Sequence, residues 1–285
     1  MHVARVLVID GNRAETRAQQ LAAGGSASGE GYVQTLHSLA PALQCDIVRP
    51  ADGEPQLPAG RALHDYDGVA ITGSALNVYD GGPHIERQLR LASAVFESGV
   101  PFFGSCWGLQ IAVTVAGGRV ERNPLGREFG FARRIQLNAA GRAHPMFAGK
   151  PEVFEAVAVH RDCIVALPAD ATELARNEMG LQAAEIRHAR GVFWGVQYHP
   201  EYSLREIAAT ALRYGKALIA EGLFRDLAER DAWVEELREL DARPQDPRLN
   251  WRLGLGPSMQ SAGVKLAELR NWLERCVLPS GAARR

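Results

Sequence analysis

Short apolar runs alternate with amphipathic stretches along most of the chain. Runs rich in branched or aromatic residues, bounded by glycine, proline or polar residues, predict strands at 6–9, 45–49, 67–74, 100–103 and 191–197. The spacing of apolar positions predicts helices at 32–43 and 86–98. Strands that alternate with helices favour a parallel sheet covered by helices on both faces. We therefore expect a flavodoxin-like α/β fold with a mostly parallel sheet.

The rest of the chain departs from this simple alternation. Residues 131–137, 172–176 and 182–187 predict antiparallel strands, and 203–220 predicts a helix that packs back on the sheet. Amphipathic helices are expected at 227–240 and 258–277. These patterns divide the chain into one domain over residues 1–222 and a helical C-terminal extension over residues 223–285. The extension would cover the sheet or form a dimer contact.

Residues 12–30 have an unusual composition. A basic, alanine-rich segment at 13–23 can form a helix, and the glycine- and serine-rich segment at 24–29 predicts a loop. A loop after the first strand of an α/β sheet often lies beside the active site. A solvent-exposed insertion without a role is the equal alternative.

Composition narrows the class of protein. The 285 residues carry a formal net charge of -1, which gives no electrostatic reason to expect nucleic acid or an anionic membrane as partner. No apolar run approaches the roughly 18 residues of a spanning helix, and the first residues predict a strand rather than a signal peptide. Four scattered cysteines argue against a disulfide framework or a zinc site. We expect a cytoplasmic protein without a metal or an organic cofactor.

The sequence around Cys106 has the layout of a nucleophile elbow. An apolar strand stops at Gly104-Ser105-Cys106-Trp107-Gly108, and a helix-like run follows at 109–116. Such a turn exposes the Cys106 side chain at the end of a sheet, and the positive end of the helix favours its thiolate form. The backbone N–H of Trp107 can then face a developing oxyanion. A buried structural cysteine is the alternative on this stretch alone.

A second stretch favours catalysis. The apolar strand at 191–197 runs into Tyr198-His199-Pro200-Glu201. A thiol nucleophile needs a base within hydrogen-bond reach and a third group that orients the base. His199 and Glu201 can fill these roles, because residues two apart at a strand end can point the same way. The two strands together predict a cysteine nucleophile with a histidine base.

These two stretches resemble the class I glutamine amidotransferases, and most closely the glutaminase domain of GMP synthase and its stand-alone relatives. The resemblance covers roughly residues 65–210. It extends to Gly126-Arg127-Glu128-Phe129-Gly130 and to His160-Arg161-Asp162, in the family's order.

The resemblance implies roles for further residues. It places a backbone N–H of Gly73 in the oxyanion hole with Trp107, and it places Gln110, Val159 and His160 beside the substrate. His160 could also be a second base, although a structural histidine is favoured. The sequence departs from the family at one turn, where Thr72-Gly73-Ser74 replaces Gly-Gly-Pro. Because proline fixes its own φ, the backbone at Ser74 loses this restraint.

The expected reaction is hydrolysis of glutamine through a Cys106 thioester, which gives glutamate and ammonia. A stand-alone γ-glutamyl amide or peptide hydrolase shares this chemistry, and a non-catalytic regulatory module is the alternative of a different class. The chain shows no nucleotide-binding fingerprint, so we expect no synthase domain in it. A separate synthase subunit and a homo-oligomer remain open as partners.

Overall fold

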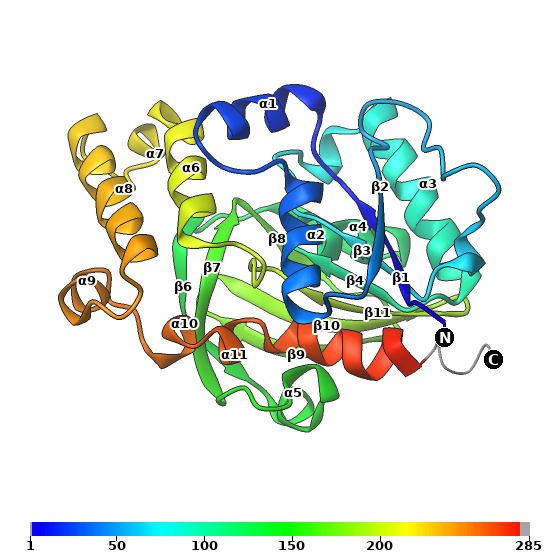
Figure 1. The fold of residues 1–285 in the computed structure, drawn as a ribbon. Helices are drawn as coiled ribbons and strands as arrows, with labels where there is room; N and C mark the ends of the chain where they lie inside the picture. The colour runs from blue at the N-terminus through cyan, green and yellow to red at the C-terminus, as the bar shows by residue number, and fades with distance from the viewer. Residues whose placement is uncertain (1, 280–285) are drawn as a thin grey trace.

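The computed structural model describes residues 2–279, and its centre is a nine-stranded sheet with helices on both faces (Figure 1). Five neighbouring strands form the parallel part. In spatial order they are β2 (Gln44–Val48), β1 (Arg5–Ile9), β3 (Gly68–Ile71), β4 (Phe102–Ser105) and β11 (Gly191–Val196). All five are short, and all except the edge strand β2 are mostly buried, as expected for strands covered on both faces. The predicted fold class is confirmed.

The sheet continues beyond β11 through antiparallel strands. In spatial order these are β10 (Gly180–His188), β9 (Ala171–Asn177), β6 (Glu128–Leu137) and β7 (Val153–His160). A separate two-stranded ribbon pairs β5 (Arg119–Arg122) with β8 (Asp162–Ala166). The segment after β11 returns to β7, because the His199 N–H donates to the Val157 carbonyl at 2.7 Å. This contact brings two strands from distant places in the sheet order to the same site.

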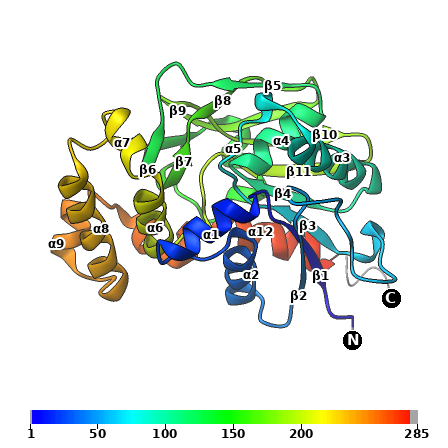
Figure 2. The same cartoon turned by 90° about the horizontal axis from the view of Figure 1, so that it is seen from above.

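Two apolar layers cover the parallel strands, and side-chain alternation separates them. On one face Val6, Val8 and Phe103 pack against α2 (Ser28–Leu39) and α12 (Ala267–Trp272). On the other face Leu7, Ile9 and their neighbours pack against α3 (Pro83–Ser98) and α4 (Trp107–Val115). Figure 2 shows α2 and α12 on one side of the strands and α3 and α4 on the other.

The remaining helices are short or lie at one end of the molecule. In chain order they are α1 (Ala14–Ala22), η1 (Leu63–Asp65), η2 (Val78–Asp80), α5 (Ala139–Ala143), η3 (Pro145–Phe147), α6 (Leu204–Tyr214), α7 (Lys216–Ala220), α8 (Leu227–Ala242), α9 (Pro247–Arg252), α10 (Pro257–Gln260), α11 (Ala262–Lys265) and η4 (Leu273–Val277). A third apolar cluster joins α6, α8 and α9 to β7. Figure 1 shows that the chain then crosses back below the sheet to α12.

Several helix boundaries differ from the sequence-based expectation. The first long helix, α2, begins at Ser28 rather than at residue 32, so the predicted loop at 24–29 is shorter than expected. Gly215, with a φ of 46°, divides the helix expected at 203–220 into α6 and α7. The helix expected at 258–277 is broken into α10, α11, α12 and η4. Apolar spacing survives such breaks, so it does not reveal them.

The C-terminal extension inserts a carboxylate into the core beneath the sheet. Glu268 on α12 is fully buried and accepts hydrogen bonds from the Tyr198 hydroxyl and, at 2.5 Å, from the Lys150 ammonium. Lys150 also lies 4.4 Å from the centre of the Phe154 ring. Burial lowers the pKa of Lys150, while the Glu268 charge opposes that change. Glu268 thus links the segment before β7 to the residue before His199.

We expect Glu268→Ala to destabilise the protein by about 3–5 kcal/mol, because removal of one partner leaves a buried charge without its counter-charge. The double variant Lys150→Met/Glu268→Leu should recover most of this loss, since it removes both charges. The measurement is the free energy of unfolding from urea denaturation followed by circular dichroism.

Glu274→Ala is the matched control, because Glu274 lies in η4 and is exposed. Its substitution should change the free energy of unfolding by less than about 0.5 kcal/mol. Equal stability of Glu268→Ala and Glu274→Ala would show that the buried pair does not hold the extension to the core.

Candidate active site

The candidate residues lie together at one edge of the sheet. The parallel strands β3, β4 and β11 end at Ile71, Ser105 and Val196, shortly before Gly73, Cys106 and His199. Ligands of open α/β sheets bind at this carboxyl edge. The sheet therefore brings together three residues that lie far apart in the sequence.

Cys106 occupies a strained turn between β4 and α4. Its φ is 52° and its ψ is −100°, a conformation that residues other than glycine rarely adopt. The Cys106 N–H donates to the Val196 carbonyl at 2.7 Å, which fixes the turn to β11. The residue is 3% exposed, and its sulfur lies 3.7 Å from the Val159 carbonyl oxygen. The predicted elbow geometry is present.

Two glycines allow this turn to form. A Cβ atom on Gly104 would lie 2.9 Å from the backbone of Gly108, and one on Gly108 would lie 2.7 Å from the Ile71 carbonyl oxygen. Both distances are shorter than real Cβ contacts, so the first turn of α4 can pack against β3 and β4 only without these side chains. The glycine spacing of the motif is therefore a packing requirement.

His199 contacts both Cys106 and Glu201. Its Nδ1 lies 2.8 Å from Glu201 Oε1, and its ring stacks on Tyr202 with centroids 4.1 Å apart. Burial alone would lower the pKa of His199. The Glu201 carboxylate and the hydrogen bond to Cys106 outweigh burial and raise the pKa to about 10. The structure thus favours a positively charged imidazole that contacts the Glu201 carboxylate and the Cys106 sulfur.

Glu201 is held by a relay of hydroxyl groups. Its second oxygen accepts a hydrogen bond from Ser105 Oγ at 2.9 Å. The Tyr32 hydroxyl on α2 lies 3.3 Å from the same Ser105 oxygen. Burial and the Glu201 charge raise the pKa of Tyr32 well above its usual value, so Tyr32 remains a donor to Ser105. Sequence reasoning missed Ser105 and Tyr32; the only signal was the position of Ser105 beside the nucleophile.

Gly73 and Trp107 lie on either side of the contact between Cys106 and His199. Gly73 lies against the imidazole, and a Cβ atom on Gly73 would overlap His199 Cε1. Trp107 is the first residue of α4, and its indole Nε1 donates to Gln88 Oε1 at 2.7 Å. In the part of the chain that the structure describes, neither backbone N–H donates to another protein group. Both remain available to a ligand.

A cavity of about 300 Å³ opens beside Cys106. Gln110, Val159 and His160 line it, so the structure brings all three predicted substrate contacts to the site. Both ring nitrogens of His160 face protein acceptors, the Asp162 carbonyl at 3.0 Å and Glu128 Oε2 at 2.8 Å. The His160 side chain is therefore a structural link rather than a free base.

An ion pair that sequence reasoning missed closes one wall of the cavity. Arg127 makes two hydrogen bonds to Glu221, at 2.6 and 3.1 Å, and its guanidinium lies 4.5 Å from the centre of the Tyr214 ring. Arg127 lowers the pKa of Glu221. The Gly-Arg-Glu-Phe-Gly segment could have indicated Arg127. Glu221 carries no local signal, because its part in the site depends on how α7 packs.

The chain also resembles known proteins in sequence. The family model described as "Glutamine amidotransferase class-I" matches residues 29–215. The chain belongs to the class I glutamine amidotransferase family. It is also 33% identical over 285 residues to a γ-glutamyl-L-1-hydroxyisopropylamide hydrolase of Pseudomonas sp, a match that covers 98% of this chain and 95% of that protein. The residues that match the family model include Cys106, His199 and Glu201.

Two further relatives show how the family match is distributed. The GMP synthase of Streptomyces avermitilis is 32% identical over 134 residues, which is 47% of this chain but 23% of the synthase. A glutamine amidotransferase structure from Thermotoga maritima superimposes with a TM-score of 0.63 at 22% identity, over 98% of this chain and all of that one. The second similarity extends the shared fold into the C-terminal extension.

In residues 2–279 no three or more histidine, cysteine or acidic side chains are grouped in a way that could hold a metal ion. Over the same residues no helix has the length and apolar character needed to cross a bilayer.

We expect Gly73→Ala to lower kcat/KM for glutamate release from a γ-glutamyl amide by about 100-fold or more, because the new methyl group would displace His199 or the Gly73 N–H. Gly53→Ala is the control, since a Cβ atom there meets nothing within 4 Å. Steady-state kinetics on both variants make the test. A Gly73→Ala enzyme as active as Gly53→Ala would remove Gly73 from the site.

We expect Glu201→Gln to lower the pKa of His199 from about 10, because the variant lacks the carboxylate that raises it. A folded-state pKa above the unfolded value of about 6.5 stabilises the protein fully below pH 6.5, and this contribution is lost as the pH rises through 10. The stability difference between wild type and Glu201→Gln should therefore be largest at pH 6 and shrink towards pH 10. Urea denaturation across this range measures it, and a difference that does not depend on pH would contradict the pairing.

Proposed function

We propose that the protein is a cysteine-dependent hydrolase of γ-glutamyl amides that acts without a synthase subunit. The observation that carries the proposal is the contact of Cys106 with His199, itself paired with Glu201, at the edge of a cavity with polar walls. The full-length similarity to a γ-glutamyl amide hydrolase supports it, because that match includes residues 223–285. The similarity to GMP synthases is confined to about half of this chain.

In the proposed mechanism, Cys106 and His199 form a catalytic pair that Glu201 orients. The Cys106 thiolate attacks the δ-carbonyl carbon of the γ-glutamyl group. The N–H groups of Gly73 and Trp107 stabilise the tetrahedral oxyanion, a role in which one donor contributes about 3 kcal/mol. Protonated His199 gives its proton to the leaving amine, and the C–N bond breaks.

A γ-glutamyl thioester then remains on Cys106. Water attacks the carbonyl carbon of this thioester while His199 accepts a proton from the water. The C–S bond then breaks, which releases glutamate and restores the Cys106 thiolate. The cavity wall formed by Gln110 and the backbone of Val159 and His160 would hold the α-amino and α-carboxylate groups of the substrate. None of these steps requires a group other than those of the chain and water.

Glutamine is the second candidate substrate, with ammonia as the leaving group. The family assignment and the GMP synthase matches favour it. In that case the protein would pass ammonia to a separate amination partner. A reducing compartment such as the cytoplasm suits either reaction, because the reaction needs a free thiol.

We further propose that the catalytic domain and the C-terminal extension have different roles. Residues 1–222 carry the catalytic groups, and the described part of the extension, residues 223–279, holds them in place. The packing of α12 against β1 and β4 and the contact between Glu268 and Tyr198 support this division.

A substrate panel tests the proposal. The panel contains glutamine, γ-glutamyl amides of small alkyl and hydroxyalkyl amines, and γ-glutamyl dipeptides, with glutamate release as the readout. We expect the amides of small amines to exceed glutamine in kcat/KM by at least about tenfold, which corresponds to about 1.4 kcal/mol. Cys106→Ala should reduce every rate by about 10⁴-fold or more.

Cys163→Ala is the matched control, because Cys163 is a half-buried free cysteine on β8. It should retain wild-type rates. Exclusive turnover of glutamine would instead identify an ammonia donor. Failure of the wild type to release glutamate from any member of the panel would remove the proposed function.

A further inference from the structure

Asn12 lies directly behind the turn that carries Gly73. It follows β1 through Asp10 and Gly11, and it is 6% exposed. Its Nδ2 donates to the Gly73 carbonyl at 3.3 Å, and its Oδ1 accepts from the Ala75 N–H at 3.0 Å. The Ser74 hydroxyl lies 3.3 Å from the same oxygen. One amide side chain therefore contacts three consecutive residues of the turn.

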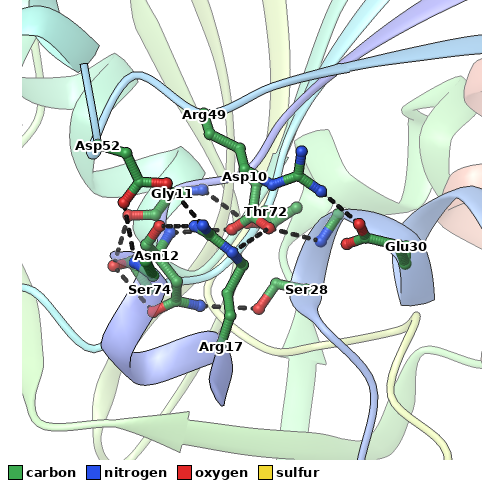
Figure 3. Close-up of polar contacts among 12 residues, drawn as sticks. Asp10, Gly11, Asn12, Arg17, Ser28, Glu30, Arg49, Asp52, Thr72 and Ser74 are labelled. Carbon is green, nitrogen blue, oxygen red and sulfur yellow. Dashed lines mark hydrogen bonds and ion pairs between the residues drawn. The ribbon is translucent and has the colours of Figure 1, made fainter. Parts of the chain in front are cut away.

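Asn12 is itself held by its neighbours (Figure 3). Its N–H donates to Asp10 Oδ1 at 3.0 Å, and its Nδ2 donates to Ser28 Oγ at 2.7 Å. The Arg17 guanidinium donates to the Asn12 carbonyl at 2.6 Å and to Asp52. The Gly29 N–H donates to the second Asp10 oxygen at 3.0 Å. The position of Asn12 is thus set by β1 and by the first residues of α1 and α2.

The hydroxyl groups of Thr72 and Ser74 also stabilise the turn by hydrogen bonds. Thr72 Oγ1 donates to the Gly73 carbonyl at 2.9 Å and accepts from the Gly11 N–H at 3.1 Å. Ser74 Oγ donates to the Gly11 carbonyl at 2.9 Å. Ser74 has no ring to fix its φ, and Gly73 is the residue type with the greatest backbone freedom. These hydrogen bonds replace the restraint that the covalent backbone lacks.

We propose that Asn12 is a positioning residue that fixes the Gly73–Ser74 peptide and thereby limits rotation of the Gly73 backbone, so that the adjoining Thr72–Gly73 peptide keeps its N–H aimed at the oxyanion. The proposal rests on the proposed function, because it gives the Gly73 N–H a task in amide hydrolysis. Stabilisation of an oxyanion depends on donors that are already oriented before the charge develops. A turn that samples several backbone conformations would lose this advantage while the thiol and its base stay intact.

The experiment compares Asn12→Ala and Asn12→Asp with the wild type. Asn12→Asp retains an acceptor for the Ala75 N–H but loses the donor to the Gly73 carbonyl. We expect kcat for a γ-glutamyl amide to fall by about 10- to 100-fold in both variants, with KM changed by less than about threefold. Alkylation of Cys106 by iodoacetamide should keep its wild-type rate, because it forms no oxyanion.

Asn250→Ala is the matched control. Asn250 is a buried asparagine on α9 whose amide donates to the Pro244 and Asp246 carbonyls, outside the cavity lining. It should lose stability but keep kcat. If Asn12→Ala retains the kcat of Asn250→Ala, or loses alkylation in proportion to kcat, the proposal is wrong.

A measurement without substrate separates this proposal from the proposed function. In protein labelled with ¹⁵N-glycine, the Gly73 signal is identified by its absence from Gly73→Ala. Asn12→Ala should shift or broaden that signal and leave those of Gly104 and Gly108 unchanged. An unaltered Gly73 signal would overturn the positioning role even if no substrate were turned over. If the wild type shows no hydrolytic activity but Asn12→Ala still shifts the Gly73 signal, only the proposed function is overturned.

Discussion

The strained backbone at Cys106 is the constraint on which the site depends. A residue with a φ of 52° persists only where its surroundings hold it. Here the holding contacts are a hydrogen bond to β11 and the close approach of α4 to β3 across Gly104 and Gly108. The same contacts place the first turn of α4 at the sulfur and set β11 beside β4, so that His199 arrives opposite the thiol.

Polar side chains hold the site from behind. Ser105 and Tyr32 support Glu201, and Asn12 supports the Gly73 turn. These groups come from β4, α2 and the loop after β1, so three separate segments converge on two parts of the candidate site, Glu201 and the Gly73 turn. Buried polar networks that are well satisfied give a single arrangement. This accounts for a site that is built on short loops and is nevertheless well defined.

The C-terminal extension contributes to the same arrangement from the face of the sheet that α2 also covers. Leu269, Trp272 and Val277 share an apolar cluster with Val6 and Phe103, and Glu268 reaches Tyr198. The extension therefore supplies one of the two helical elements on that face. A chain without it would expose an apolar layer and would deprive Lys150 of its counter-charge.

The sequence by itself determined the fold class, the elbow at Cys106 and the candidacy of His199 and Glu201. These features depend on local patterns: β-branched runs, glycine spacing and a strand that ends in His-Pro-Glu. Tertiary structure alone decided which groups Asn12, Tyr32 and Glu221 contact at the site. It also decided the structural role of the His160 side chain and the breaks in the helices after residue 203. Such roles arise from contacts between residues that can lie more than 60 positions apart, as Asn12 and Gly73 do. A hydrogen bond over that separation depends on how strands pair and helices pack, and no local pattern records it.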